Sequence, residues 1–306
     1  MRKSYWKVIA ICTVVFTLAF MIAGCGDKPI EKKKADIITL KVGNVVQKDH
    51  PMNVAVEKFA QKVAAKSNNH IKIIIYPARQ LGDDRQLFEQ VQSGALDMAE
   101  VSVAPMGATT PLVTALQMPF LFTNWDQYLK VMNDPVTDKL LAGLEKNQVK
   151  GLAVYNAGFR HFVTVDKTIG QPSDIKNLKF RVAETPQHVD IFTAIGASPT
   201  PMPYGEIYTG LQSKVIDGLE MDLSAILMEK HYEVAKNITL SKHFTWPAIL
   251  MINLNKFNSL SPADQKMIVD SAKEVVAENV KDIGEIEKKA IAELKNKNVN
   301  LKDFGD

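Results

Sequence analysis

The chain has 306 residues, of which 46% are hydrophobic and 23% are charged. This composition excludes a disordered tail or linker, and the length is enough for two domains of ordinary size with a substantial core. Its 37 basic and 34 acidic residues give a formal net charge of +3, which does not indicate a nucleic-acid partner.

The first 25 residues have the pattern of a bacterial secretory signal. A basic start, MRKSYWK, precedes the apolar run VIAICTVVFTLAFMIAG, which ends in Ala23 and Gly24 directly before Cys25. Small residues before a cysteine suit a signal peptidase that cuts before a lipid-modified cysteine. We therefore predict a lipoprotein signal peptide over residues 1–24 and lipidation of Cys25. The alternative is a transmembrane anchor, since a run of 17 apolar residues is at the lower limit for spanning a bilayer.

Cleavage before Cys25 would remove Cys12 and three basic residues. The mature chain would then contain no disulfide, and its 34 basic and 34 acidic residues would give a formal net charge of 0. Residues 25–36 are polar and lysine-rich with nothing to bury, so we expect a short tether between the lipid anchor and the folded part.

Strand and helix patterns alternate from residue 37. IITLKVGNVV has the pattern of a strand, apolar residues recur at helical spacing over residues 50–69, and HIKIIIYPA is a second strand that Pro77 ends. A helix pattern follows over residues 83–101, with Gly94 near its end. This βαβα order predicts an α/β fold with a mostly parallel sheet.

The same alternation recurs after residue 150. KGLAVYNAG, NLKFRVAE and AILMINLN have strand patterns, whereas PQHVDIFTAIGA and YGEIYTGLQSKV have helix patterns. From Ser261, an N-cap followed by proline, apolar spacing predicts one helix of over thirty residues in which Gly284 can introduce a bend. Two α/β halves joined by crossing strands and a long helix predict two lobes with a cleft that closes on a small ligand by hinge motion.

We expect the first lobe to comprise residues 37–157, completed by about 246–285. The second lobe is expected over residues 158–245, completed by about 286–306. The long C-terminal helix would span both lobes.

Three stretches of the chain resemble the solute-binding proteins of tripartite ATP-independent periplasmic (TRAP) transporters, the dicarboxylate- and sialate-binding type. YPARQLGDDRQLFEQVQSGALDM resembles the family's first-lobe helix, NAGFRHFVT its first binding-arginine segment, and residues 175–218 its central signature. The resemblance covers about residues 38–300. It implies a periplasmic-binding-protein fold, a small organic carboxylate as ligand, TRAP permease subunits as partner, a monomeric state and no cofactor.

The central signature contains Arg181, at the end of the strand pattern NLKFRVAE. In the family, the matching arginine makes a two-pronged salt bridge to the ligand's carboxylate. The chemistry fits independently, because a guanidinium offers two parallel N–H donors to the two oxygens of a carboxylate. The alternative is an arginine at a strand end that pairs with a surface acid.

The resemblance implies four further ligand contacts. Arg160 matches a second basic residue that supports the carboxylate, and its alternative role is a hinge salt bridge. Tyr204 matches an aromatic residue that packs against the ligand's carbon skeleton, and its alternative place is the core. Ser102 and His50 match positions near the opposite wall of the cleft, where Ser102 is suited to a hydroxyl.

The segment DGLEMD, residues 217–222, departs from the DGQENP of many family members. Met221 replaces an asparagine that bonds the ligand, and Asp222 adds a carboxylate at or near the pocket. A carboxylate there repels a second carboxylate on the ligand and accepts hydrogen bonds from hydroxyls, which favours a sugar acid or hydroxylated monocarboxylate over a C4-dicarboxylate. We expect Asp83 and Asp84 to cap the following helix instead of binding the ligand.

No catalytic constellation accompanies these features. The histidines lack metal-ligand spacing, and the sequence has neither a nucleophile elbow nor a phosphate-binding loop. We therefore expect an extracytoplasmic binding protein, with no enzymatic activity and no metal, that meets the membrane only through a lipid anchor at Cys25. A ligand-presenting lipoprotein that serves a membrane sensor is the alternative, since its pocket would contain the same residues.

Overall fold

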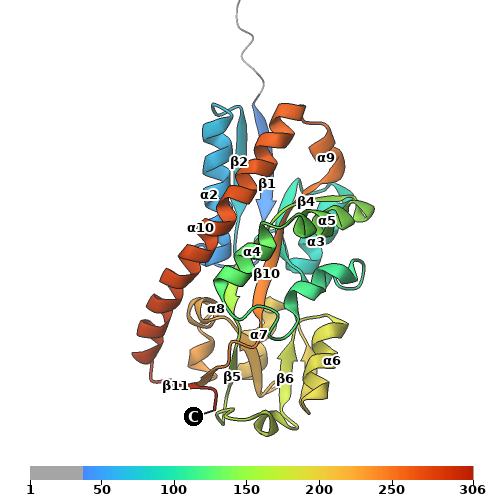
Figure 1. Cartoon of the computed structure of the whole chain (residues 1–306). Helices are drawn as coiled ribbons and strands as arrows, with labels where there is room; N and C mark the ends of the chain where they lie inside the picture. The colour runs from blue at the N-terminus through green and yellow to red at the C-terminus, as the bar shows by residue number, and fades with distance from the viewer. Residues whose placement is uncertain (1–36, 306) are drawn as a thin grey trace, which may run out of the picture. The chain divides into compact units, whose positions relative to one another are not determined.

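The computed structural model describes residues 37–305 (Figure 1). The predicted signal peptide, the tether and Cys25 lie outside the described residues. The strands are β1 (Ile38–Gly43), β2 (Ile71–Tyr76), β3 (Met98–Ser102), β4 (Val149–Phe159), β5 (His161–Thr164), β6 (Lys179–Val182), β7 (Ser198–Pro201), β8 (Gly218–Met221), β9 (Asn237–Leu240), β10 (Thr245–Asn253) and β11 (Asn300–Asp303). The α-helices are α2 (Pro51–Lys66), α3 (Asp84–Ser93), α4 (Trp125–Met132), α5 (Pro135–Ala142), α6 (Pro186–Ala194), α7 (Ile207–Gln212), α8 (Leu223–Met228), α9 (Leu254–Asn258) and α10 (Pro262–Lys295).

The sheet of the first lobe has the strand order β2-β1-β3-β10-β4. The strands β1, β2 and β3 pair in parallel, as the βαβα pattern predicts, whereas β10 is antiparallel to both of its neighbours. The expectation of a mostly parallel sheet is therefore correct for its first strands and wrong for β10. Because β10 returns from the second lobe, its direction is set by the crossing and not by a βαβ unit.

The second lobe contains a mixed sheet with the order β11-β9-β5-β8-β6-β7. The strands β6, β7 and β8 pair in parallel, and β5 is antiparallel to both β8 and β9. A separate apolar cluster lies on this sheet and includes Val163, Leu219 and Ile238. Two sheets, each with its own strand order, confirm the predicted two-lobed α/β fold.

The lobes are joined at two strand crossings and along α10. The crossing strands meet at Arg160, between β4 and β5, where the backbone N–H of Arg160 donates to the Phe244 carbonyl oxygen at 2.8 Å. Helix α10 packs against α2 and β4 of the first lobe and against α8 of the second (Figure 1). It is capped by Ser261 and continues without a break through Gly284, so the predicted long helix is confirmed. No helix within residues 37–305 is both long enough and apolar enough to cross a bilayer.

The helix pattern over residues 83–101 is only half correct. Helix α3 begins with a capping box at Asp83 and ends where Gly94 adopts a left-handed conformation with φ 78°. The residues after Gly94 form β3, which is buried along its whole length. A strand buried on both faces has no alternation that would distinguish it from a buried helix, which is why the sequence pattern missed it.

Candidate ligand-binding site

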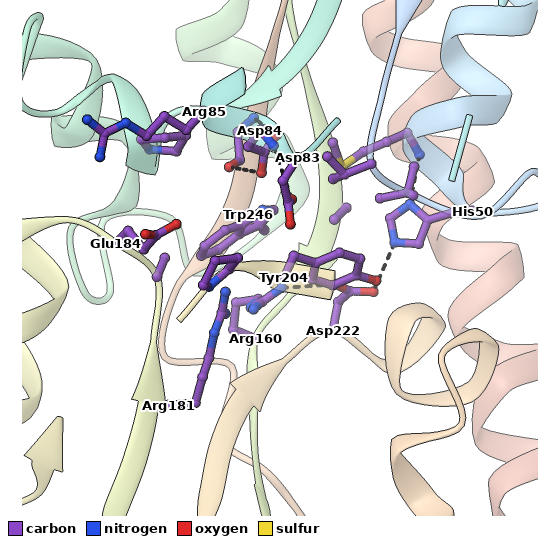
Figure 2. Close-up of a pocket in the computed structure, with 18 residues that line it drawn as sticks. His50, Asp83, Asp84, Arg85, Arg160, Arg181, Glu184, Tyr204, Asp222 and Trp246 are labelled. Atoms are coloured by element: carbon purple, nitrogen blue, oxygen red, sulfur yellow. Dashed lines mark hydrogen bonds and ion pairs between the residues drawn. The ribbon is translucent and has the colours of Figure 1, made fainter. Parts of the chain in front are cut away.

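A cavity of about 620 Å³, counting its opening to solvent, lies between elements of the two lobes (Figure 2). Its lining includes residues from the segments after β1 and β2 and from the end of β3 on the first-lobe side. On the other side it includes residues from β6, from the segment after β8 and from the crossing strands. Six of the predicted ligand contacts line it: His50, Ser102, Arg160, Arg181, Tyr204 and Asp222.

Arg181 carries a buried positive charge at one end of the cavity. Along β6, Phe180 and Val182 point into the core, so the side chain of Arg181 is directed to the opposite face, as the alternation predicts. Its Nε and Nη2 donate to the Met202 carbonyl oxygen at 3.0 and 2.7 Å, and it has no ion pair with any residue in 37–305. Burial lowers the pKa of Arg181 to about 10, which leaves the guanidinium charged at neutral pH.

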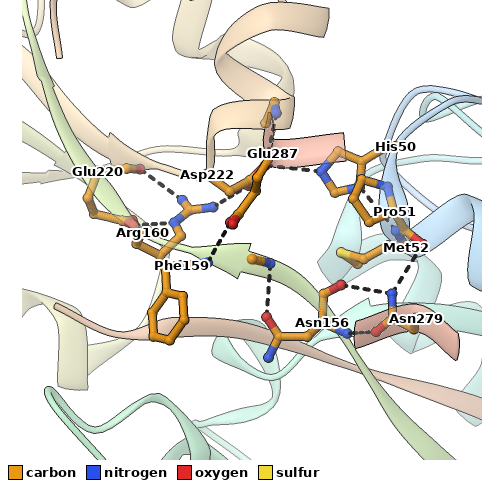
Figure 3. A network of polar contacts seen from close by, with 12 residues as sticks. His50, Pro51, Met52, Asn156, Phe159, Arg160, Glu220, Asp222, Asn279 and Glu287 are labelled. Atoms are coloured by element: carbon orange, nitrogen blue, oxygen red, sulfur yellow. Dashed lines mark hydrogen bonds and ion pairs between the residues drawn. The ribbon is translucent and has the colours of Figure 1, made fainter. Parts of the chain in front are cut away.

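Arg160 lies in the same cavity, but its charge is balanced by the protein. Its Nε donates to the Glu220 carboxylate, its Nη1 to Asp222 Oδ2 at 3.0 Å and its Nη2 to the Glu220 carbonyl oxygen at 2.8 Å (Figure 3). The guanidinium carbon also lies 4.0 Å from the centroid of the Trp246 ring. Arg160 thus makes the predicted hinge salt bridge and also lies at the cavity, as the other alternative predicts. Two of its five N–H donors make no hydrogen bond to residues 37–305.

Asp222 connects the lobes at the side of the cavity. It caps α8 by accepting from the Ala225 backbone N–H at 2.8 Å, and its Oδ1 lies 3.3 Å from His50 Nε2. Because His50 Nδ1 accepts from the Met52 N–H at the start of α2, the ring proton is assigned to Nε2, which donates to Asp222. Burial alone would raise the pKa of Asp222, but the contacts with His50, Arg160 and Ala225 outweigh it and lower the pKa to about 2. Asp222 is therefore a charged acceptor at neutral pH.

The first-lobe wall also contains the carboxylate of Asp84. Its Oδ1 accepts from the Ser102 backbone N–H at 3.2 Å and its Oδ2 from the Ser102 hydroxyl at 2.8 Å. Burial raises the pKa of Asp84 to about 6. The expected helix-capping role is correct for Asp83, whereas the Asp84 side chain faces the cavity and was missed as a site residue. The hydroxyl hydrogen of Ser102 is directed to Asp84, so Ser102 can meet a ligand only as an acceptor.

Met221 does not line the cavity, contrary to the prediction. Successive side chains of β8 point to opposite faces, and Met221 packs with Leu219 in the apolar cluster of the second lobe. Between them, Glu220 points the other way and pairs with Arg160. Glu220 was missed by sequence reasoning, although an acidic residue within the apolar run GLEM was a signal for it. Trp246, also missed, lines the cavity beside Arg160.

Tyr204 lines the cavity and also packs partly against the apolar clusters of both lobes, so its two predicted alternatives are not exclusive.

No group of three or more histidine, cysteine, aspartate or glutamate side chains that could hold a metal ion occurs within residues 37–305. Two lobes, a polar cavity between them and a buried arginine define a solute-binding protein.

Residues 42–306 match the DctP family model, described as bacterial extracellular solute-binding protein, family 7. The chain belongs to this family, the solute-binding proteins of TRAP transporters, which are extracytoplasmic binding proteins and not enzymes.

Relatives cover most of the chain. It is 30% identical to the 2,3-diketo-L-gulonate-binding periplasmic protein YiaO of Escherichia coli over 285 residues, 93% of this chain and 86% of the relative. Its fold is similar to that of the sugar acid binding protein DctPAm from Advenella mimigardefordensis in complex with galactonate, with a TM-score of 0.84, 30% identity and coverage of 88% and 87% of the two chains. A TRAP periplasmic solute binding protein from Polaromonas, bound to D-erythronate, gives a TM-score of 0.84, 31% identity and coverage of 88% and 89%.

Proposed function

We propose that this chain captures a small organic carboxylate through a salt bridge with Arg181 and delivers it to the membrane subunits of a TRAP permease. One observation supports the proposal above all others: Arg181 is 3% exposed, and no carboxylate within residues 37–305 lies within ion-pair distance of its guanidinium. A buried charge without a counter-ion is costly, so a cavity with this residue at its end favours an anionic ligand.

The acids of the cavity narrow the class of ligand. Asp84 and Asp222 would repel a second carboxylate on the ligand, whereas both can accept hydrogen bonds from hydroxyl groups. We therefore propose a sugar acid or another hydroxylated monocarboxylate, with a C4-dicarboxylate as the alternative. The galactonate and D-erythronate bound by two similar structures belong to the favoured class.

The remaining lining residues have supporting roles in this proposal. Arg160 offers its free N–H donors to the carboxylate or a neighbouring hydroxyl, and Tyr204 packs against the carbon skeleton. Ser102 and His50 complete the opposite wall. A membrane sensor remains the alternative partner, because it would require the same cavity.

The proposal also includes the lipid anchor at Cys25. We further propose that the first lobe comprises residues 37–157, completed by about 246–285, and that the second lobe comprises residues 158–245, completed by about 286–306. The junction of β4 and β5 at Arg160 and the return of the chain through β10 support these limits.

The ligand class is tested by a thermal-shift screen of the purified full-length chain. D-galactonate and D-erythronate are compared with succinate and L-malate, and D-galactose serves as the control without a carboxylate. A ligand at about 100 times its Kd should stabilise the fold by roughly 2.7 kcal/mol. A shift with the hydroxylated monocarboxylates and none with D-galactose is expected. Shifts with succinate and L-malate alone would favour the C4-dicarboxylate alternative.

A further inference from the structure

An ion pair connects the two lobes beside the cavity. Arg79 follows β2 in the first lobe, and Glu229 is the C-cap of α8 in the second. Arg79 Nη1 and Nη2 donate to Glu229 Oε1 and Oε2, each at 3.1 Å, and Gln47 Nε2 of the first lobe donates to Glu229 Oε1 at 3.1 Å. Two parallel N–H···O bonds are the strongest geometry available to an arginine and a carboxylate.

The backbone that presents Arg79 is in an unfavourable conformation. Ala78 and Arg79 have φ angles of 53° and 63°, in the left-handed region that residues with a side chain seldom adopt. The turn is fixed by hydrogen bonds from the Ala78 N–H to the Val46 carbonyl oxygen at 2.8 Å and from the Arg79 N–H to the Asn44 carbonyl oxygen at 3.1 Å. Such strain is typical of functional positions, where it directs a side chain to a place that the side chain would not reach from a relaxed turn.

Arg79 also covers a segment that lines the cavity. Its guanidinium carbon lies 5.2 Å from the centroid of the Tyr204 ring. A Cβ atom on the next residue, Gly205, would lie 3.1 Å from Arg79 Cδ, so the side chain of Arg79 packs closely against the backbone at Gly205. The Gly205 N–H donates to Asp83 Oδ2 at 3.2 Å, which adds a second bond between the lobes at the same place.

We propose that the Arg79–Glu229 pair is a latch that holds the two lobes together and positions Tyr204 against the ligand. This inference rests on the proposed function, because it assumes that the cavity binds a ligand and that the lobes separate to release it. A contact made across the cleft exists only when the lobes are together. It therefore raises the population of the closed form and slows its opening, without touching the ligand.

The pair is shielded enough to have this effect. The side chains of Arg79 and Glu229 are 24% and 15% exposed, in contrast to the i,i+4 pair of Arg85 and Glu89 within α3, whose side chains are 70% and 59% exposed. Fully exposed pairs contribute little to stability, whereas a shielded bidentate pair is less screened. Glu89→Gln is therefore a matched control, because it removes an Arg–Glu pair that lies within one lobe.

The test uses the purified full-length chain and its variants Glu229→Gln, Glu89→Gln and the charge swap Arg79→Glu with Glu229→Arg. Association and dissociation of D-galactonate are followed by stopped-flow tryptophan fluorescence, since Trp246 lines the cavity. Small-angle scattering without ligand gives the radius of gyration. Glu229→Gln is expected to raise the dissociation rate about three- to tenfold, to change the association rate less than about twofold, and to increase the ligand-free radius of gyration.

The charge swap should recover part of this loss, whereas Glu89→Gln should match the wild type. Rates and scattering of Glu229→Gln that equal those of the wild type, or an equal effect of Glu89→Gln, would overturn the latch. If the wild type binds neither D-galactonate nor D-erythronate, the proposed ligand class is wrong. The ligand-free scattering then decides the latch: a larger radius in Glu229→Gln supports it, and an unchanged radius rejects it.

Discussion

Arg160 and Arg181 line the same cavity, but the protein neutralises the charge of only one of them. Arg160 is bonded to the carboxylates of Glu220 and Asp222, so its charge is neutralised before any ligand enters. Arg181 has only the Met202 carbonyl oxygen as a partner within residues 37–305. We therefore expect a carboxylate ligand to gain more electrostatic stabilisation from Arg181 than from Arg160, whose charge is already balanced.

Arg181→Lys should weaken D-galactonate binding at least about tenfold, because lysine loses one charge-assisted bond and its compact ammonium group is more costly to dehydrate. Arg181→Ala should weaken binding further, since the ligand carboxylate would be buried without a partner. The measurement is calorimetric titration, with melting curves to confirm folding. A folded Arg181→Lys variant that binds within a factor of two of the wild type would contradict the bidentate salt bridge.

Glu287 on α10 gives a prediction for pH. Burial raises its pKa from the ordinary value of 4.5 to about 7, while its Oε1 accepts from the Phe159 N–H at 3.4 Å. The native state therefore retains a proton that the unfolded chain loses, and ionised Glu287 costs stability as the pH rises from about 4.5 through 7.

Glu287→Gln keeps the acceptor and removes this cost. Its melting temperature should exceed that of the wild type at pH 8, by an amount that corresponds to about 3 kcal/mol in the free energy of unfolding, and the difference should shrink towards pH 5. Glu293→Gln, at an exposed position of the same helix, is the control. A difference that does not change between pH 5 and pH 8 would show that the ionisation of Glu287 is not coupled to folding.

At the scale of single elements, local sequence accounts for where most helices begin. Ser261 caps α10 by accepting from the Asp264 N–H at 3.1 Å, and Pro262 occupies the first turn, where its missing N–H is not needed. Strands are less local. The four residues of β8 alternate so that Glu220 faces Arg160 while Met221 enters the core, and a shift by one residue would exchange them.

Ser261→Ala should destabilise the protein by about 1 kcal/mol, because it leaves an N–H of the first turn of α10 without its capping acceptor. The melting temperature measures the loss. Ser93→Ala is a suitable control, because the exposed Ser93 hydroxyl donates to the Gln90 carbonyl oxygen within α3 and caps nothing. Equal effects of the two substitutions would contradict the capping role.

At the scale of the whole molecule, α10 is fixed to the first lobe and reaches the second. Asn279 of α10 accepts from the Asn156 N–H at 2.8 Å and donates to the carbonyl oxygens of Asn156 and Pro51 (Figure 3). Further along α10, Glu287 reaches the crossing strand at Phe159. Gly158, directly before this point, has φ 133° and is a natural place for the backbone to turn. Relative motion of the lobes should therefore concentrate at the crossing and in the second half of α10.

Saturating D-galactonate should decrease the radius of gyration of the wild-type chain, because a ligand that contacts both lobes favours the closed form. Small-angle scattering measures the change, and D-galactose, which lacks the carboxylate, should leave the profile as it is. A profile that does not change when calorimetry shows saturation would leave the hinge mechanism without support.

Cys25→Ser should release the chain from the membrane fraction or leave the precursor uncleaved, because only a cysteine can accept the predicted lipid. Cys12→Ser, within the predicted signal peptide, is the matched control and should remain anchored. Sedimentation of membranes and mass spectrometry of the N-terminus give the result. Unchanged processing and membrane association of Cys25→Ser would exclude the lipoprotein.

The sequence alone determined the features that depend on neighbours along the chain. The alternation of NLKFRVAE turned Arg181 away from the core, and the residues at Ser261 started α10. Each of these follows from the side-chain period of one element or from a cap within a few residues. Together with the resemblance to TRAP solute-binding proteins, they were enough for the fold class and for the prediction that Arg181 faces the cavity.

Only the tertiary structure decided which charges meet. Arg160 pairs with acids that lie 60 and 62 residues away, Arg79 meets Glu229 at a separation of 150 residues, and Asp84 bonds Ser102 across 18 residues. An acidic side chain looks the same in the sequence whether it neutralises an arginine, lines a cavity or caps a helix. Its role is set by burial and by partners from distant elements, because an ion pair is strong only where packing removes water and holds both groups in register.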